Sequence, residues 1–172
     1  WLKDIKKEIN IPLQLQNDVK MIHQGCYFTY QQDSTYYLYI NEVGIGSSYF
    51  YKDEPLYGRS GIMGEIGLIS LKGKTINQQI RECQNQEEFN EILSLLLSMV
   101  FTMIDPKRLE LSLDLKWNYE EKKIENVLNK IDKDCFKHLY FHEDVSSMLF
   151  EGLVYRGVVY LLKERIERNE KI

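Results

Sequence analysis

Glycine is concentrated in one part of the chain, where the backbone could form a binding loop. Seven of the ten glycines lie between Gly44 and Gly73. Glycine adopts backbone conformations that other residues avoid, and it allows a ligand to approach the main chain closely. This tight backbone is the first indication of a functional site. The alternative is that the glycines at positions 58, 61, 64 and 67 only satisfy turn geometry.

The residues that most often bind metals do not have the spacing of a metal site. Cys26, Cys83 and Cys135 lie far apart, and their odd number fits neither a disulfide framework nor a CxxC pair. We therefore expect free thiols in a reducing compartment, which indicates a cytoplasmic protein. His138 and His142 are four residues apart, but they fall in an aromatic, extended stretch without a third ligand nearby. We expect no bound metal and no other cofactor.

Length and composition indicate one globular unit. The 172 residues are 44% hydrophobic and 12% aromatic, which is enough for a packed core, and they fit a single domain over residues 1–172. A net charge of −4 without a long basic stretch argues against direct binding of nucleic acid. The apolar window at residues 92–104 is shorter than the roughly 20 residues that span a bilayer, so no membrane association is expected. Because the chain begins with tryptophan and enters a helix at once, we treat it as a fragment.

Hydrophobic periodicity predicts alternating strands and helices. The expected helices are residues 2–9, 17–28, 75–83, 89–104, 122–131 and 145–167. The expected strands are residues 13–16, 36–43, 45–52, 66–71, 109–115 and 136–141. Asn17 and Asp18 cap the second helix, and Thr75 and Gln78 form a capping box at the third. An opening run of strands followed by alternation predicts an α/β fold with a mixed sheet covered by helices.

Three motifs in this order resemble the repressor, open reading frame and kinase (ROK) family. They are Asn-Asp-Val-Lys at residues 17–20, Glu-Val-Gly-Ile-Gly at residues 42–46 and Gly-Glu-Ile-Gly at residues 64–67. The corresponding family motifs are Asn-Asp-Ala-Asn, Gly-Thr-Gly-Ile-Gly and Ala-Gly-Glu-Ile-Gly-His. Later segments at residues 103–115 and 157–162 also match, so the resemblance covers essentially the whole chain. It implies a ribonuclease H-like fold, as the C-terminal lobe of the actin and sugar-kinase superfamily.

The resemblance also assigns roles to individual residues. Asp18 is at the position of the family's general base, which takes the proton from a sugar hydroxyl during phosphoryl transfer. Asn17, Asp18 and Glu65 are the candidate sugar-binding residues. Two simpler alternatives remain open: Asn17 and Asp18 could act only as a helix cap, and Glu65 could be an exposed loop acid.

Departures from the family pattern concentrate on the nucleotide side. Val43, Gly44, Gly46 and Ser47 occupy the position of the family's phosphate turn. An acid, Glu42, replaces the first glycine of that turn, and an anionic side chain there repels phosphate. Asp114 and Leu115 stand where kinases place a glycine pair against the nucleotide, so side chains would fill the nucleotide's space. We therefore expect a degenerate phosphate turn and no catalytic residue.

The sugar side and the family's zinc site are altered as well. Leu68 replaces the family's histidine after Gly-Glu-Ile-Gly, and the cysteine-rich zinc loop is absent. Lys20 replaces the second asparagine of the first motif, and Cys26 replaces a helix glutamate. These changes predict no zinc and leave sugar binding as a hypothesis.

The favoured interpretation is the effector-sensing or dimerisation lobe of a ROK-type transcriptional regulator that is catalytically inactive. Its partners would be a sugar or sugar-phosphate effector and DNA, the latter bound only through an upstream domain outside this chain. The alternatives are a hexose or aminohexose kinase of the same family and a vestigial dimerisation module without a ligand.

Two helices indicate self-association. The expected helix at residues 89–104 and the terminal helix at residues 145–167 are apolar on more than one face. We expect a twofold homodimer in which helices, and not sheet edges, form the contact. Part of this apolar surface could instead face an upstream lobe.

Overall fold

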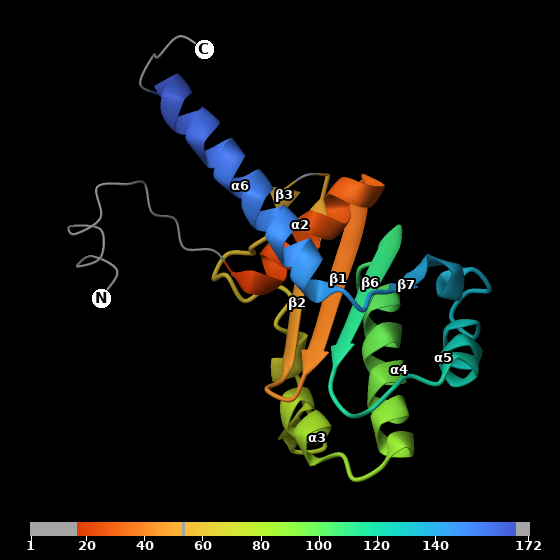
Figure 1. Ribbon diagram of the computed structural model, residues 1–172. Coiled ribbons are helices and arrows are strands. Elements are labelled where there is room, and N and C mark those ends of the chain that lie inside the picture. The colour runs from red at the N-terminus through yellow and green to blue at the C-terminus, as the bar shows by residue number, and fades with distance from the viewer. Residues whose placement is uncertain (1–16, 53, 168–172) are drawn as a thin grey trace.

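A mixed five-stranded sheet forms the centre of the molecule (Figure 1). The computed structural model describes residues 17–52 and 54–167. The strands are β1 (Ser34–Asn41), β2 (Ile45–Tyr51), β3 (Glu54–Pro55), β6 (Arg108–Asp114) and β7 (Leu139–Phe141), in the order β3-β2-β1-β6-β7. Strands β1, β2 and β3 are antiparallel neighbours, whereas β6 and β7 run parallel to β1. The predicted α/β class with a mixed sheet is confirmed.

Helices cover both faces of this sheet. Helices α2 (Asp18–Tyr30) and α6 (Val145–Glu167) lie on one face, and α3 (Ile76–Glu82), α4 (Gln86–Met103) and α5 (Glu121–Leu128) lie on the other (Figure 1). The caps at Asn17 and Thr75 form as predicted, because each side chain accepts a hydrogen bond from an amide of the first turn. The helix expected at residues 2–9 and the strand expected at residues 13–16 lie outside the described residues.

The face toward α3, α4 and α5 forms the hydrophobic core. Alternate residues of the central strands, including Leu38 and Ile40 of β1 and Leu111 of β6, point to this side and are completely buried. They pack against α4, whose inward side chains Leu93 and Leu97 are also completely buried. Each such side chain contributes roughly 1.5–3 kcal/mol by its removal from water.

The opposite face is polar, although it is equally buried. Thr35 is paired with Arg108 and Tyr37 with Glu110, so these four side chains share the face covered by α2 and α6. The sequence predicts a half-buried β6 from its strict alternation, and this prediction is wrong. The alternating polar residues face a second helical layer in place of solvent.

Two expected strands are largely replaced by other structure. Residues 66–71 form a 3-10 turn (Ile66–Leu68) and the short strand β4 (Ser70–Leu71), which pairs with β5 (Lys74–Thr75). The apolar residues Ile66, Ile69 and Leu71 pack against the core, so their hydrophobicity reflects packing and not strand pairing. Residues 136–141 begin within another 3-10 turn (Cys135–His138) and become extended only at β7.

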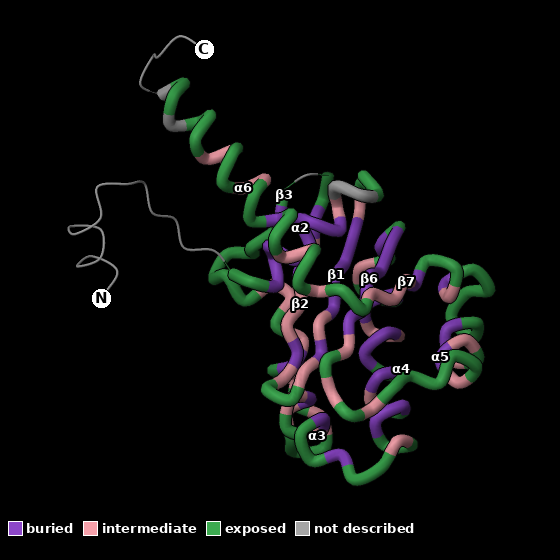
Figure 2. Tube along the Cα trace, in the orientation of Figure 1, coloured by how far each residue is buried: buried purple, intermediate pink, exposed green. Residues whose placement is uncertain are grey.

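Helix α6 crosses α2 and continues away from the sheet. The crossing brings Gly152 of α6 against Gly25 of α2, and the far half of α6 is largely exposed (Figure 2). Within the described residues, Val145–Lys163 is long and apolar enough to cross a membrane by length and composition, with a mean hydropathy of 1.3. Length and composition of one helix are weak evidence for a membrane span. The Arg156 guanidinium of this segment lies 3.8 Å from the Glu54 carboxylate of β3, so this part of α6 contacts the edge of the sheet.

Candidate functional site

The first turn of α2 presents two of the candidate sugar-binding residues. Asn17 is the N-cap, and its Oδ1 accepts a hydrogen bond from the Lys20 amide at 3.1 Å. Asp18 Oδ1 accepts from the Val19 amide at 2.8 Å, and both the Asn17 and Asp18 side chains are exposed. Gly46 of β2 lies directly beneath this turn, because a Cβ there would overlap Val19. The hairpin therefore fixes the position of the α2 N-terminus.

Lys20 connects this turn to the glycine-rich loop at residues 56–67. Its side chain is only 9% exposed, and Nζ lies 3.6 Å from the centre of the Tyr57 ring. Burial lowers the pKa of Lys20, and the nearby Glu65 carboxylate opposes that shift. Lysine in place of the family's asparagine contributes a contact between α2 and the loop.

A chain of hydroxyl groups holds the loop against β2. The Ser47 hydroxyl donates to the Gly64 carbonyl, and the Tyr36 hydroxyl lies 2.7 Å from Ser47 Oγ. Since the single Ser47 proton goes to Gly64, Tyr36 is the donor to Ser47. Burial is the main cause that raises the pKa of Tyr36 to about 12. Ser47, expected in a phosphate turn, instead fixes the loop that bears Glu65.

Three backbone amides at the hairpin turn donate hydrogen bonds to side chains of this protein. Asn41 Oδ1 accepts from the Val43 amide at 2.9 Å and from the Gly44 amide at 3.1 Å. Asn77 Oδ1 accepts from the Ile45 amide at 2.8 Å. Anion sites in such turns depend on free N–H groups directed at the ligand. In this structure the amides of Val43, Gly44 and Ile45 are already hydrogen-bonded.

Asn77, in the first turn of α3, is a site residue that the sequence analysis missed. Its side chain packs between the hairpin turn and the glycine loop: a Cβ on Gly44 would lie 2.9 Å from Asn77 Oδ1, and a Cβ on Gly67 would overlap the same atom. Gly67 is buried, whereas Leu68, which replaces the family's histidine, is 59% exposed. The glycines at 44 and 67 were the available signal, because each permits a close approach by another residue.

A second acidic group lies at the carboxyl ends of β1 and β6. The Tyr39 hydroxyl donates to Asp114 Oδ2 at 3.0 Å. Burial and this bond to the Asp114 carboxylate raise the pKa of Tyr39, and the negative charge of Asp18 acts in the same direction. Next to Asp114, a hollow of about 380 Å³ is also lined by Glu42 and Val43. Asp114 and Glu42 therefore line the same hollow, on the side of the site where the family resemblance predicts the nucleotide position.

The histidines occupy separate environments. His138 contacts the Lys107 carbonyl at 3.0 Å, whereas His142 contacts the Glu110 carboxylate, so they do not form a ligand pair. His23 is completely buried and lies between the hydroxyls of Ser48 (2.6 Å) and Thr35 (2.8 Å). Over residues 17–52 and 54–167, no group of three or more His, Cys, Asp or Glu side chains is arranged to hold a metal ion.

Solved structures provide the comparison for this geometry, since the sequence matches no protein-family model and no curated protein. A ROK family protein from Streptococcus pneumoniae, solved with sucrose, aligns over 96% of this chain and 71% of its own, with a TM-score of 0.63 and 16% identity. A ROK glucokinase from Streptomyces griseus, solved with glucose and AMPPNP, aligns over 87% and 70%, with a TM-score of 0.59 and 11% identity. The chain has the ROK sugar-kinase fold. A ROK hexokinase from Thermus thermophilus aligns over 87% and 66%, with a TM-score of 0.56 and 15% identity.

At these identities the similarity establishes the ROK fold and not the activity. It confirms the expected α/β fold with a mixed sheet covered by helices. The three ROK structures are a protein solved with sucrose and two sugar kinases.

Proposed function

We propose that this chain is the effector-binding lobe of a ROK-type transcriptional regulator, in which sugar binding has replaced phosphoryl transfer. A sugar or sugar phosphate would bind between the N-terminus of α2 and the glycine loop, where the Asp18 and Glu65 carboxylates would accept hydrogen bonds from sugar hydroxyls. The lobe would pair with a second copy. DNA would be bound by a separate domain of the regulator, because this chain carries a net charge of −4.

The observation behind this proposal is the occupied hairpin turn. In a kinase of this fold, free amides in such a turn would bind phosphate. Here the Asn41 carboxamide accepts the Val43 and Gly44 amides, and the exposed acid Glu42 lies in the same turn. Phosphoryl transfer depends almost entirely on positioning and on stabilisation of the phosphate charge. A turn that is internally hydrogen-bonded and bordered by Glu42 and Asp114 supports binding without transfer.

Isothermal titration calorimetry tests the sugar site. We expect binding of at least one hexose, N-acetylhexosamine or hexose 6-phosphate, and no binding of AMPPNP with Mg²⁺. Asp18→Asn and Glu65→Gln should each weaken the sugar affinity about tenfold or more, because a charge-assisted hydrogen bond is lost. Asp132→Asn, at a remote exposed acid, is the matched control. AMPPNP binding, or failure of every sugar to bind, would contradict the proposal.

A kinase is the second candidate, and the exposed Asp18 carboxylate at the α2 N-terminus favours it. Two of the structures described above are sugar kinases. The motif resemblance implies that Asp18 is at the position of the family's general base. A coupled ADP assay with hexoses and aminohexoses distinguishes the candidates. Sugar-dependent ATP turnover that Asp18→Asn abolishes would establish the kinase.

A further inference from the structure

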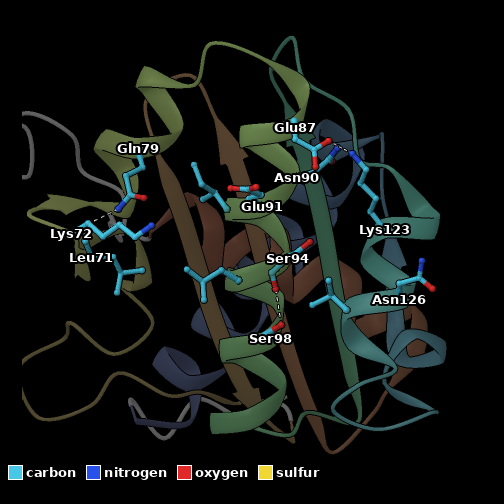
Figure 3. Close-up of a pocket in the computed structure, with 13 residues that line it drawn as sticks. Leu71, Lys72, Gln79, Glu87, Asn90, Glu91, Ser94, Ser98, Lys123 and Asn126 are labelled. Atoms are coloured by element: carbon cyan, nitrogen blue, oxygen red, sulfur yellow. Dashed lines mark hydrogen bonds and ion pairs between the residues drawn. The ribbon is translucent and has the colours of Figure 1, made fainter.

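A groove of about 820 Å³ runs along the outer side of α4, on the sheet face opposite α2 and α6 (Figure 3). The hairpin β4–β5 and α3 line one side of it, and α5 lines the other. Its apolar residues include Leu71, Ile92, Leu95 and Val127. Leu95 projects from the middle of α4 and is 42% exposed. The candidate sugar site is elsewhere, at the N-terminus of α2.

Most polar side chains that line the groove already have partners within the chain. Gln79 Nε2 donates to the Leu71 carbonyl at 3.0 Å, and Asn90 Nδ2 donates to Glu120 at 2.7 Å. Ser98 Oγ donates to the Ser94 carbonyl of its own helix at 2.7 Å. Burying a polar group is costly mainly when its hydrogen bonds are lost. A protein surface could therefore cover this groove at a small cost in unsatisfied hydrogen bonds.

Two charged residues of the groove are different. Of its four charged side chains, Glu87 and Lys123 form an ion pair with each other, whereas Lys72 and Glu91 have no ion pair within the described parts of the chain. Lys72 lies in the turn between β4 and β5, and Glu91 lies on α4. The groove thus presents one unpaired cation at the turn of the β4–β5 hairpin and one unpaired anion on α4, together with its apolar residues.

We propose that this groove binds the same groove of a second copy about a twofold axis, with Lys72 of each copy opposite Glu91 of the other. A twofold interface uses one patch twice, so the patch must be complementary to itself. A single cation and a single anion meet that condition and yield two equivalent ion pairs, while the two Leu95 side chains pack near the axis. A strongly acidic or basic partner would leave one of the two charges unpaired. This inference rests on the dimer of the proposed function and assigns its surface.

Sedimentation velocity of the 172-residue chain at low micromolar concentration is the experiment. We expect a dimer that Leu95→Glu converts to a monomer, because two like charges would be buried near the axis. Lys72→Glu and Glu91→Lys should each raise the dissociation constant about tenfold at low salt. Combining Lys72→Glu with Glu91→Lys should restore association, because the two pairs re-form with exchanged signs.

The matched control is Leu161→Glu, at a similarly exposed leucine (55%) on α6. We expect this variant to stay dimeric. A monomeric wild type, a dimer that survives Leu95→Glu, or a dimer that Leu161→Glu alone dissociates would overturn the inference. Circular dichroism reports folding, and if Leu95→Glu unfolds, the charge-reversal series decides. Calorimetry with sugars on the same variants separates this inference from sugar binding, since Lys72 and Glu91 are remote from Asp18.

Discussion

Gly25 of α2 and Gly152 of α6 meet where their helices cross, and the Gly25 amide nitrogen is 3.2 Å from the position that a Cβ on Gly152 would take. The same Cβ would overlap the Met21 carbonyl, and a Cβ on Gly25 would overlap the Met148 carbonyl. The two backbones are therefore in direct contact. Because α2 begins at Asp18, this crossing also fixes one side of the candidate sugar site.

Gly152→Ala should destabilise the protein by about 1–3 kcal/mol, because the new methyl group meets rigid backbone and forces the helices apart. Gly157→Ala is the matched control in the same helix: a Cβ there has no neighbour within 4 Å, so a gain of up to about 1 kcal/mol is expected. Urea unfolding measures both changes. Equal effects of the two substitutions would contradict a close crossing.

Acid should weaken the fold through His23. Burial lowers the pKa of His23 to about 3, whereas the unfolded chain keeps a value near 6.5. Between these values the unfolded state binds more protons than the folded state. The stabilisation that comes from keeping His23 neutral is therefore fully present above pH 6.5 and is lost as the pH decreases toward 3. From pH 7.5 to pH 5 this loss amounts to about 2 kcal/mol.

Urea unfolding of wild type and His23→Gln at both pH values isolates this contribution. The variant should lack the additional loss on acidification, whatever its stability at pH 7.5. His138→Gln, at an exposed histidine, should keep the wild-type pH dependence. If His23→Gln and the wild type lose the same free energy of unfolding between pH 7.5 and pH 5, the pH dependence comes from groups other than His23.

Removing Arg108 should be strongly destabilising. Its guanidinium lies between two aromatic rings, with Cζ 3.4 Å from the centre of Tyr30 and 3.3 Å from that of Tyr140, and it pairs with the buried Glu110. Arg108→Leu leaves the Glu110 carboxylate without its main counter-charge, at a cost of about 3–5 kcal/mol.

Two further variants test that explanation. Arg108→Leu combined with Glu110→Leu should be less destabilised than Arg108→Leu alone, because the unpaired buried charge is gone. Lys107→Ala removes an exposed ion pair with Asp33 and should have no measurable effect. A double variant less stable than Arg108→Leu would show that the pair itself, and not the stranded carboxylate, is responsible.

Asn77→Ala should loosen the contact between the hairpin turn and the glycine loop. The Ile45 amide loses its acceptor, at a cost of about 1–3 kcal/mol, and its hydrogen exchange should accelerate. Asn77→Asp keeps an Oδ acceptor and should restore most of the protection. Unchanged exchange of the Ile45 amide in Asn77→Ala would refute this role.

The sequence was sufficient where local signals determine the structure. Asn17 and Thr75 predict the starts of their helices because they are good N-cap residues, and the glycine turn at Gly44 predicts the hairpin. It was insufficient where a distant segment determines burial. Glu110 alternates with leucines, which predicts that its face of β6 is exposed to solvent. In the structure that face is buried, because α6, which begins at Val145, helps to cover it.

In the candidate site, too, residues in local motifs were predicted and residues that act through other contacts were not. Asp18 and Glu65 were identified as candidates because they belong to short motifs. Asn41 and Asn77 were missed, because an asparagine that accepts backbone amides looks in the sequence like any turn or helix residue. The bonds of Asn41 are local, to amides two and three residues further on, as in an Asx turn. The contacts of Asn77 depend on a turn and a loop brought together by folding, and no local spacing encodes that approach.

The crossing of α2 and α6 also determines how far a local change would be felt. From Gly152 to its end at Glu167, α6 extends about 22 Å at the ordinary rise per residue. A rotation of about 5° at the crossing would displace that end by about 2 Å, because a stiff helix amplifies angular motion with distance from its pivot. A small rotation of α2 against α6 would thus be converted into a translation at the tip of α6.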